Sequence, residues 1–232
     1  MEESVLKEIG KQLAEVVKKR DTTLNETSLA NLDLNPFLLR ALGLETPEEI
    51  ADFVLTQRVE RSIVTSFGQR IQKIAKMLAE RGTGVEGADI CKEKDGRRYY
   101  IQIKAGPQTV NKDITNEINR LLGSATRRNQ GSIALIGMTY GTRNRVSDIL
   151  QKYSQVDWLI GREFWEFISD DEECAKKIFD AAAEVARQPG GGVSYRKHFE
   201  EKVRELASQI RERYGTDESG RVRWDRLFDD NM

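Results

Sequence analysis

The sequence predicts an α/β (α+β) protein in which a small central mixed β-sheet is flanked by helices. Two observations predict this class. Runs rich in β-branched and aromatic residues, typical of strands, occur only between about residues 85 and 161. On both sides of that region, apolar residues recur at the spacing of a helix. We therefore expect a layered sheet core between helical N- and C-terminal regions.

The first third of the chain is expected to be helical. Thr46-Pro47 combines a cap residue with proline in the first turn, which is typical of a helix start. The tract over residues 21–35 is polar and rich in turn residues, so we expect a loop there. A break is also expected near residues 65–68. The predicted helices cover 1–20, 36–42, the stretch from Thr46 to that break, and 69–81.

The middle of the chain opens with two expected strands, about 85–91 and 98–104, joined by a charged hairpin. Asp95-Gly96 favours a tight turn because glycine tolerates positive φ. Gly106-Pro107 then ends strand pairing. The following elements are expected to be a helix over 113–123, a strand over 132–140, a helix over 146–152 and a strand over 156–161.

The last third returns to helices, expected over 163–169, 172–188 and 195–214. The run Pro189-Gly-Gly-Gly192 predicts a flexible joint between the last two. The tail over 216–232 is polar with interleaved apolar residues, so it is either docked through them or frayed.

Length and composition indicate an ordinary water-soluble globular protein. The 232 residues can bury one substantial core, so we expect a single domain with a helical region at 1–82, a sheet core at 83–165 and a helical region at 166–232. No apolar run reaches the ~18 residues that span a bilayer. Two cysteines provide no disulfide framework, and the N-terminus does not resemble a signal peptide. These features predict a cytoplasmic protein without a membrane partner.

The charge is uneven although the net charge is only −1. Residues 92–145 hold eleven Lys and Arg against four acids, a net charge of +7, which leaves −8 for the rest. Such a cluster suits a polyanion as partner, but it is also compatible with an ordinary solvated face.

One acid, one amide and one ammonium are expected to converge at the two central strands. Asp89 is expected near the end of the first strand. Gln102 and Lys104 are two residues apart on the second, so they share a face. Together they could hold a divalent metal and a phosphate. The single histidine, His198, cannot build a histidine-rich metal site.

Hydrolysis of a phosphodiester needs an activated water and stabilisation of the developing charge. Magnesium prefers oxygen ligands and keeps several waters. We expect Asp89 to be a metal ligand, with Gln102 and the Ile103 carbonyl as neutral oxygen ligands. Lys104 is expected to contact the scissile phosphate and the attacking water.

These residues carry a resemblance to a known superfamily. The pattern Gly84-x-x-Gly-Ala-Asp-Ile90, followed by a strand that ends Gln102-Ile-Lys-Ala-Gly-Pro107, resembles the PD-(D/E)xK nucleases. Surrounding phrases, such as Asn35-Pro-Phe-Leu-Leu39 and Ile160-Gly-Arg-Glu-Phe-Trp165, resemble type II restriction endonucleases. The likeness covers most of residues 35–185 and implies a restriction-endonuclease-like fold.

Carried over residue by residue, the motif's acid is Asp89 and its lysine is Lys104. Gln102 departs from the pattern, which usually has an acid there. Three explanations stay open: another acid supplies the charge, the metal is bound weakly, or the chain is an inactive relative. We favour the first, and the candidate acids are Glu60, Glu80 and Glu86.

For DNA binding, the helix that begins near Asn111 offers a positive end to a phosphate. Asparagine and arginine pair with adenine and guanine edges, which suggests base contacts from this helix. Arginines expected in loops beside the third strand suit phosphate contacts. The full set of candidates is Asn111, Lys112, Asn116, Asn119, Arg120, Arg127, Arg128, Arg143 and Arg145.

The resemblance implies site-specific, magnesium-dependent cleavage of double-stranded DNA that leaves a 5′-phosphate, with Mn²⁺ as a substitute ion. A homodimer is expected because palindromic sites match two-fold symmetry. A cognate DNA methyltransferase is expected in the same system, although not as a bound subunit. Two alternatives stay open: a structure-specific or repair nuclease of the same fold, and a catalytically inactive DNA-binding relative.

Overall fold

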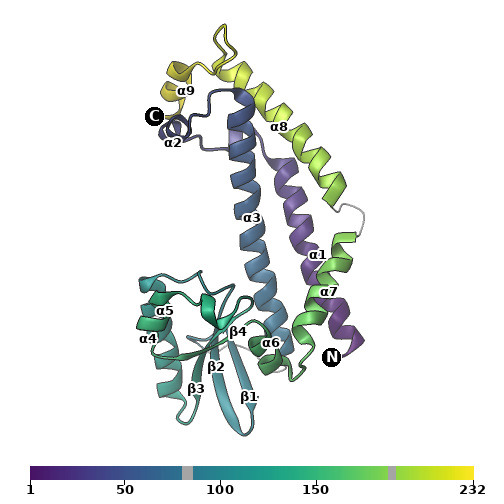
Figure 1. Ribbon diagram of the computed structural model, residues 1–232, viewed down its shortest axis with the longest axis vertical. Coiled ribbons are helices and arrows are strands. Elements are labelled where there is room, and N and C mark those ends of the chain that lie inside the picture. Colours follow the sequence, from purple (N-terminus) through teal and green to yellow (C-terminus); the bar gives the residue numbers. More distant parts are fainter. Residues whose placement is uncertain (80–85, 188–191) are drawn as a thin grey trace. The chain divides into compact units, whose positions relative to one another are not determined.

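The computed structural model describes residues 1–79, 86–187 and 192–232 (Figure 1). The helices are α1 (Glu3–Glu26), α2 (Pro36–Ala41), α3 (Pro47–Leu78), α4 (Lys112–Arg128), α5 (Asp148–Tyr153), α6 (Arg162–Ser169), α7 (Cys174–Arg187), α8 (Gly192–Tyr214) and α9 (Trp224–Asn231), with 3-10 turns η1 (Leu29–Asn31) and η2 (Arg143–Arg145). The strands are β1 (Ile90–Lys94), β2 (Arg97–Lys104), β3 (Ile133–Met138) and β4 (Asp157–Ile160). The chain divides into two compact units, 1–14 with 67–185 and 15–66 with 186–232.

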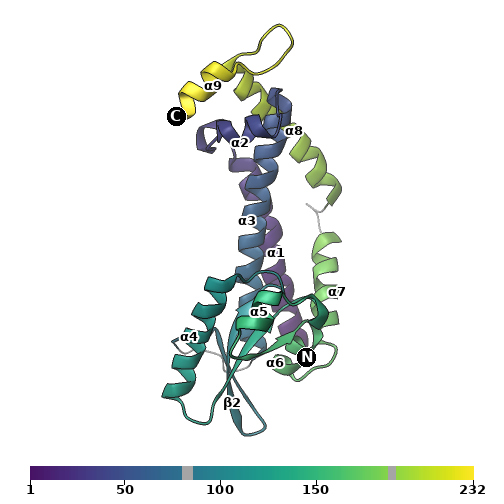
Figure 2. The ribbon, with the colours of Figure 1, turned by 60° about the vertical axis from the view of Figure 1, so that its left-hand side comes forward.

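The first unit contains a four-stranded mixed sheet in the order β1-β2-β3-β4, which confirms the predicted fold class. β1 and β2 are antiparallel, whereas β2, β3 and β4 are parallel. Asp95 and Gly96 both have positive φ, 52° and 72°, so the predicted hairpin turn is present. Because three strands are parallel, their carboxyl ends lie at one end of the sheet, opposite the β1–β2 hairpin (Figure 2).

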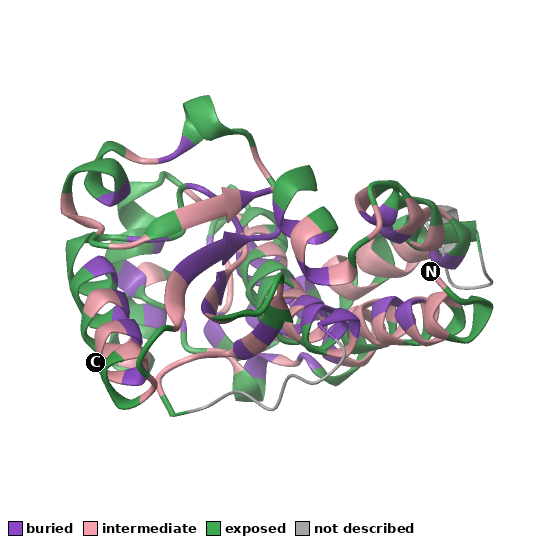
Figure 3. Ribbon diagram, turned by 90° about the horizontal axis from the view of Figure 1, so that it is seen from below, coloured by how far each residue is buried: buried purple, intermediate pink, exposed green. Residues whose placement is uncertain are grey.

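Helices cover both faces of this sheet. Tyr100, Ile136 and Met138 form a buried cluster with apolar residues of α4 and α5 on one face. On the other face, α6 packs so closely that a Cβ on Gly137 would lie 2.2 Å from the Phe164 ring. Figure 3 shows the buried residues concentrated on the strands and on the helix surfaces that face them. Residues at alternate positions of β2 therefore meet different helices.

The first strand begins later than the sequence suggested. It covers Ile90–Lys94, so Asp89 precedes the strand and does not lie near its end. The two-residue turn at Asp95 and Gly96 lets the ladder continue through Lys94, which the sequence placed in the hairpin. Lys92 is part of this ladder. The residue is buried, and its ammonium is paired with Asp170 at 2.5 Å.

Three helices are longer than predicted. α1 continues through residues 21–26 because Leu24 is fully buried in a core. α3 does not break at 65–68, since buried residues continue on one side of it and offset the cost of about 1 kcal/mol for a glycine inside a helix. α4 continues to Arg128 because Leu122 and Ala125 still face the core. Local sequence propensity predicted an end or a break at each of these positions, but the burial of apolar residues beyond them extends the helices.

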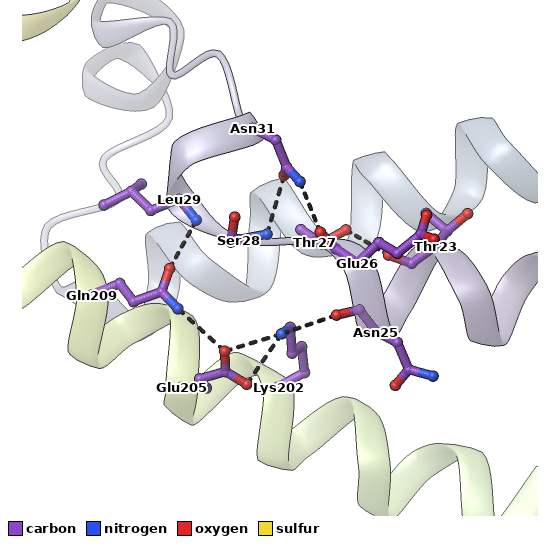
Figure 4. Close-up of polar contacts among 10 residues, drawn as sticks. All are labelled: Thr23, Asn25, Glu26, Thr27, Ser28, Leu29, Asn31, Lys202, Glu205 and Gln209. Atoms are coloured by element: carbon purple, nitrogen blue, oxygen red, sulfur yellow. Dashed lines mark hydrogen bonds and ion pairs between the residues drawn. The ribbon is translucent and has the colours of Figure 1, made fainter.

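The second unit is helical, with its own apolar core of residues from α1, α2, α3, α8 and α9. Polar contacts add to this packing: Gln209 on α8 accepts a hydrogen bond from the Leu29 amide at 2.8 Å (Figure 4). The tail is docked through Leu227, which is fully buried on α9. The joint predicted at 189–192 falls mostly outside the described residues. Among the described residues, no helix combines the length and apolar character needed to cross a membrane.

Candidate active site

A glycine positions the candidate acid at the start of β1. Gly87 has φ +97°, and a Cβ there would lie 2.6 Å from the Leu121 carbonyl oxygen of α4. The chain therefore passes directly over α4, which only glycine permits. Two residues later, the Asp89 amide donates to the Ile101 carbonyl at 2.9 Å, which attaches the acid to β2.

The structure brings Asp89 and Gln102 into direct contact. Asp89 Oδ2 accepts hydrogen bonds from Gln102 Nε2 and from the Ile103 amide, both at 2.8 Å. Only the nitrogen end of the Gln102 amide can donate, so Oε1 faces away from this bond. Asp89 and Gln102 are half-buried, whereas Ile103 is buried in the core. A carboxylate, a side-chain amide and a peptide group thus lie side by side.

Strand geometry adds two further groups. Thr139 donates to the Lys104 carbonyl on the β3 side, while the Ile103 amide faces Asp89. Because successive residues of a strand direct their main-chain groups to opposite edges, the Ile103 carbonyl faces the Asp89 side. Lys104 is two residues from Gln102, so both side chains leave the same face, and Lys104 is half-buried.

The three acids considered as additional ligands lie in different parts of the chain. Glu86 is exposed and pairs with Arg128 at 2.5 Å. Glu60 is exposed on α3 in the helical unit, and Glu80 lies outside the described residues. Within residues 1–79, 86–187 and 192–232, no group of three His, Cys, Asp or Glu side chains could hold a metal.

This donor set fits a hard divalent cation that retains waters. Its atoms are oxygens of one carboxylate, one amide and one peptide carbonyl, the ligand types that magnesium accepts. The neighbouring Cys91 packs against the apolar cluster on the α4 side of the sheet, and burial raises the pKa of its thiol. The arrangement therefore favours an oxygen-coordinated ion, with weaker charge than two carboxylates would supply.

Basic and polar residues gather at the carboxyl ends of the parallel strands. Asn111 caps α4 through a hydrogen bond from the Ile114 amide at 2.9 Å, and Lys112 follows it, exposed. Arg143 pairs with Glu163, whereas Arg145 is exposed, and its carbonyl accepts from Gln108. Since β2 ends at Lys104, these residues belong to the same end of the sheet as the candidate site.

The candidate base readers on α4 differ in their availability. Asn116 is exposed. Asn119 donates to the Tyr153 carbonyl at 2.8 Å and accepts from the Gln155 amide at 3.0 Å, so both ends of its amide hold the fold together. Arg120 is exposed and pairs with Glu117 at 2.6 Å on the same helix.

Arg127 and Arg128 are not in a loop, as the sequence suggested, but in the last turn of α4. α4 runs antiparallel to the strands that it connects, so its last turn lies near the amino end of β3. These two arginines are therefore at the opposite end of the sheet from Lys104.

One exposed residue was missed by the sequence analysis. Tyr140 was expected to end a buried strand, but β3 ends at Met138 and Tyr140 is 55% exposed. Its aromatic ring suits a strand as well as a loop, so propensity could not separate the two. The glycine that follows, Gly141 with φ +110°, was the available signal for a strand end.

A comparison with protein families now adds to this geometry. The family model for type II restriction endonuclease EcoO109I matches residues 3–189. The chain belongs to this family. A search of curated proteins found no match.

Membership in the EcoO109I family confirms the predicted resemblance to restriction endonucleases. The chain is a nuclease that cleaves DNA at specific sites, and restriction endonucleases in general use divalent metal ions. The matched residues include the sheet, Asp89, Gln102 and Lys104. The family favours the restriction interpretation over a repair or structure-specific nuclease.

Proposed function

We propose that this EcoO109I-family chain is a magnesium-dependent type II restriction endonuclease with its active site at Asp89, Gln102, Ile103 and Lys104. The observation that carries the proposal is the contact of Asp89 with both Gln102 Nε2 and the Ile103 amide, each at 2.8 Å. It supports a common site for groups that come from two strands.

The proposed ligands are the Asp89 carboxylate, Gln102 Oε1 and the Ile103 carbonyl. Bound there, magnesium would supply Lewis-acid stabilisation of the phosphate and lower the pKa of a coordinated water. Mn²⁺ is proposed as a substitute because it accepts the same oxygen ligands. An additional acid, Glu80, is proposed to add the charge that Gln102 lacks.

The chain's own residues position the reacting groups. Asp89 is held in place because Oδ2 accepts hydrogen bonds from two donors of β2. Lys104 would bring its ammonium to the scissile phosphate and to the attacking water, and so favour the hydroxide form of that water. In-line displacement would leave a 5′-phosphate.

The proposed DNA-binding surface consists of the exposed groups at the carboxyl ends of the strands. Asn111, Lys112, Arg143 and Arg145 are proposed to contact phosphates. Asn116 and Arg120 are the proposed base readers. Asn119 is given a scaffolding role, and Arg127 and Arg128 have none in this surface because they lie at the other end of the sheet.

We further propose that the enzyme acts as a homodimer, because two-fold symmetry matches a palindromic site. A DNA methyltransferase of the same specificity is proposed as its genetic partner, without being a bound subunit. A genomic neighbour that encodes such an enzyme would support this.

Digestion of a large phage DNA with and without magnesium tests the activity. Discrete fragments are expected for the native chain, and none for Asp89→Ala or Lys104→Ala at equal protein concentration. EDTA should abolish cleavage, and excess magnesium should restore it. A smear that persists in both variants would contradict the proposal, because it would indicate a contaminating nuclease or another site.

Gln102 favours one alternative, a DNA-binding relative that lost cleavage. Such a protein would bind phage DNA equally with magnesium and with EDTA and would leave it uncut. The digestion therefore separates the two functions without knowledge of the recognition sequence.

A further inference from the structure

Tyr140 is an exposed aromatic residue just after β3. Its ring is 55% exposed, while the residue before it, Thr139, is buried. The backbone is fixed: the Tyr140 amide donates to the Ala105 carbonyl at 3.2 Å, and the Thr139 hydroxyl donates to the same carbonyl at 2.8 Å. The exposed ring therefore projects from an ordered segment.

A buried glycine supports one side of this ring. A Cβ on Gly106 would lie 2.4 Å from Tyr140 Cζ and 2.7 Å from its hydroxyl oxygen. Real Cβ atoms do not approach so closely, so the ring rests on the Gly106 backbone where any other side chain would displace it. Because the residue as a whole is 55% exposed, the side chain keeps surface that a ligand can reach.

Two further close approaches lock the neighbouring loops together. A Cβ on Gly141 would lie 2.8 Å from the Pro107 ring, and a Cβ on Gly161 would lie 2.7 Å from the Gly141 carbonyl oxygen. The loops after β2, β3 and β4 thus form one packed layer. Tyr140 stands on a rigid support, so presenting it to a ligand costs little conformational entropy.

The position of the ring relates it to the proposed site. Gly106, which it covers, is two residues beyond Lys104, and Tyr140 is two residues beyond Met138, the partner of Lys104 in the ladder. Ligands of α/β sheets bind outside the carboxyl ends of parallel strands. The charged candidates at the same end of the sheet, Lys112 and Arg145, are exposed and suit phosphates or polar edges.

We propose that Tyr140 is a DNA-contact residue: its open ring face packs against a deoxyribose of the strand whose phosphate lies at Lys104. The inference rests on the proposed function and adds an apolar contact to a surface otherwise made of charged and polar groups. Its role is to hold the sugar next to the scissile phosphate in register.

Steady-state cleavage of phage DNA tests the contact. Tyr140→Ala should raise KM about tenfold, the scale of an aromatic contact with a nucleotide, and change kcat less than twofold. Tyr140→Phe should recover the wild-type KM because the ring carries the contact. Phe179→Ala, which removes another exposed aromatic residue at 72% exposure on α7, is the matched control and should leave KM unchanged.

Salt dependence separates this contact from a charged one. Fluorescence anisotropy of a labelled 30-base-pair duplex with calcium gives the slope of log affinity against log salt. Tyr140→Ala should weaken binding at each salt concentration with an unchanged slope, whereas Arg145→Ala should reduce the slope by about 0.9. An unchanged affinity and KM in Tyr140→Ala, or a Phe variant as weak as the Ala variant, overturns the proposal.

A second variant guards against a folding defect. Gly106→Ala keeps the tyrosine but forces the ring off its support, and it should also raise KM while its circular dichroism spectrum stays native. Failure of the proposed function would look different: the wild type would produce no discrete fragments, and Asp89→Ala would match it, whatever Tyr140→Ala does to duplex binding.

Discussion

At Gln102, a neutral amide lies against Asp89, the acid proposed as a metal ligand. The amide does two things that a carboxylate could not: it donates to Asp89 Oδ2, and it avoids repulsion between two anions when no cation lies between them. The same choice reduces the negative charge that attracts a metal. We infer that Gln102 lowers the affinity for the metal and keeps Asp89 ordered when no metal is bound.

Gln102→Glu should therefore raise the affinity for magnesium and lower the stability of the metal-free protein. In EDTA at pH 7, loss of the hydrogen bond and repulsion with Asp89 should lower the free energy of unfolding by about 1–3 kcal/mol. In a magnesium titration, the midpoint of thermal stabilisation should move to lower concentration, because the added carboxylate strengthens binding to the folded state. Differential scanning fluorimetry measures both effects.

Gln102→Leu is the matched control, since it removes the bond without adding charge. It should lower stability in EDTA and show no gain in magnesium affinity. If the Glu variant behaved like the Leu variant in the titration, Gln102 would not lie at the metal.

The sequence predicted Asp89, Gln102 and Lys104 as a site because their spacing is a chemical pattern, and the structure places Gln102 against Asp89. It could not identify Tyr140, since the ring rests on Gly106, which lies 34 positions earlier in the chain. It also could not show that the Asn119 amide donates to the Tyr153 carbonyl and accepts from the Gln155 amide. Such contacts depend on which distant segments meet, and no local propensity records that.

At the scale of elements, the segment before β1 decides where Asp89 lies. Gly87 lets the chain touch α4, and the next residues then join the ladder with β2. The sequence predicted two strands and their turn correctly because Asp95-Gly96 is a local signal. It placed β1 too early because the approach to α4 is a tertiary contact. The same cause explains α3, where burial carries the helix across the predicted break at 65–68.

Gly87→Ala should therefore impair both stability and cleavage. The new Cβ combines strained positive φ with a 2.6 Å approach to the Leu121 carbonyl, so Asp89 must move. Gly131→Ala has the same kind of strain, with φ +81°, but nothing within 4 Å of its Cβ. The control should lose about 1–2 kcal/mol from the backbone alone. Urea unfolding and phage DNA digestion should show a larger loss for Gly87→Ala, and equal losses would exclude the clash.

The corner between α6 and α7 predicts a pH dependence of stability. Asp171 caps α7 by accepting from the Glu173 amide, and the hydrogen-bonded Lys177 ammonium is the main cause that lowers the pKa of Asp171 to about 2. The pKa is about 3.9 in the unfolded chain. The stabilisation is thus complete above about pH 5 and is lost as the pH falls toward 2, because the unfolded state takes up the proton first.

Asp171→Asn keeps the size of the side chain but not its charge. It should be less stable than the wild type at pH 7, and the difference in urea midpoint should shrink steadily between pH 5 and pH 2. A difference that stayed constant over this range would assign the effect to packing and not to the ionised carboxylate.

At the scale of the whole molecule, the proposed active site contains one set of Asp89, Gln102 and Lys104, enough for one phosphodiester. Cleavage of both strands at one palindrome therefore needs two copies of the site, which a homodimer provides in symmetric positions. A monomer would have to rebind for the second strand. The two modes differ in the products expected when an inactive variant is co-expressed with the native chain.

Co-expression of the native chain with an excess of Asp89→Ala separates them. In a dimer, most native subunits then lie beside an inactive one, so each encounter cuts a single strand. A plasmid that the native enzyme linearises should accumulate as nicked circles, and the ratio of nicked to linear product should rise with the share of variant. Co-expression with more native chain is the control and should leave the ratio unchanged. If the variant only slowed cleavage, with the ratio constant, each chain would act alone, and the homodimer would be the wrong assembly for this enzyme.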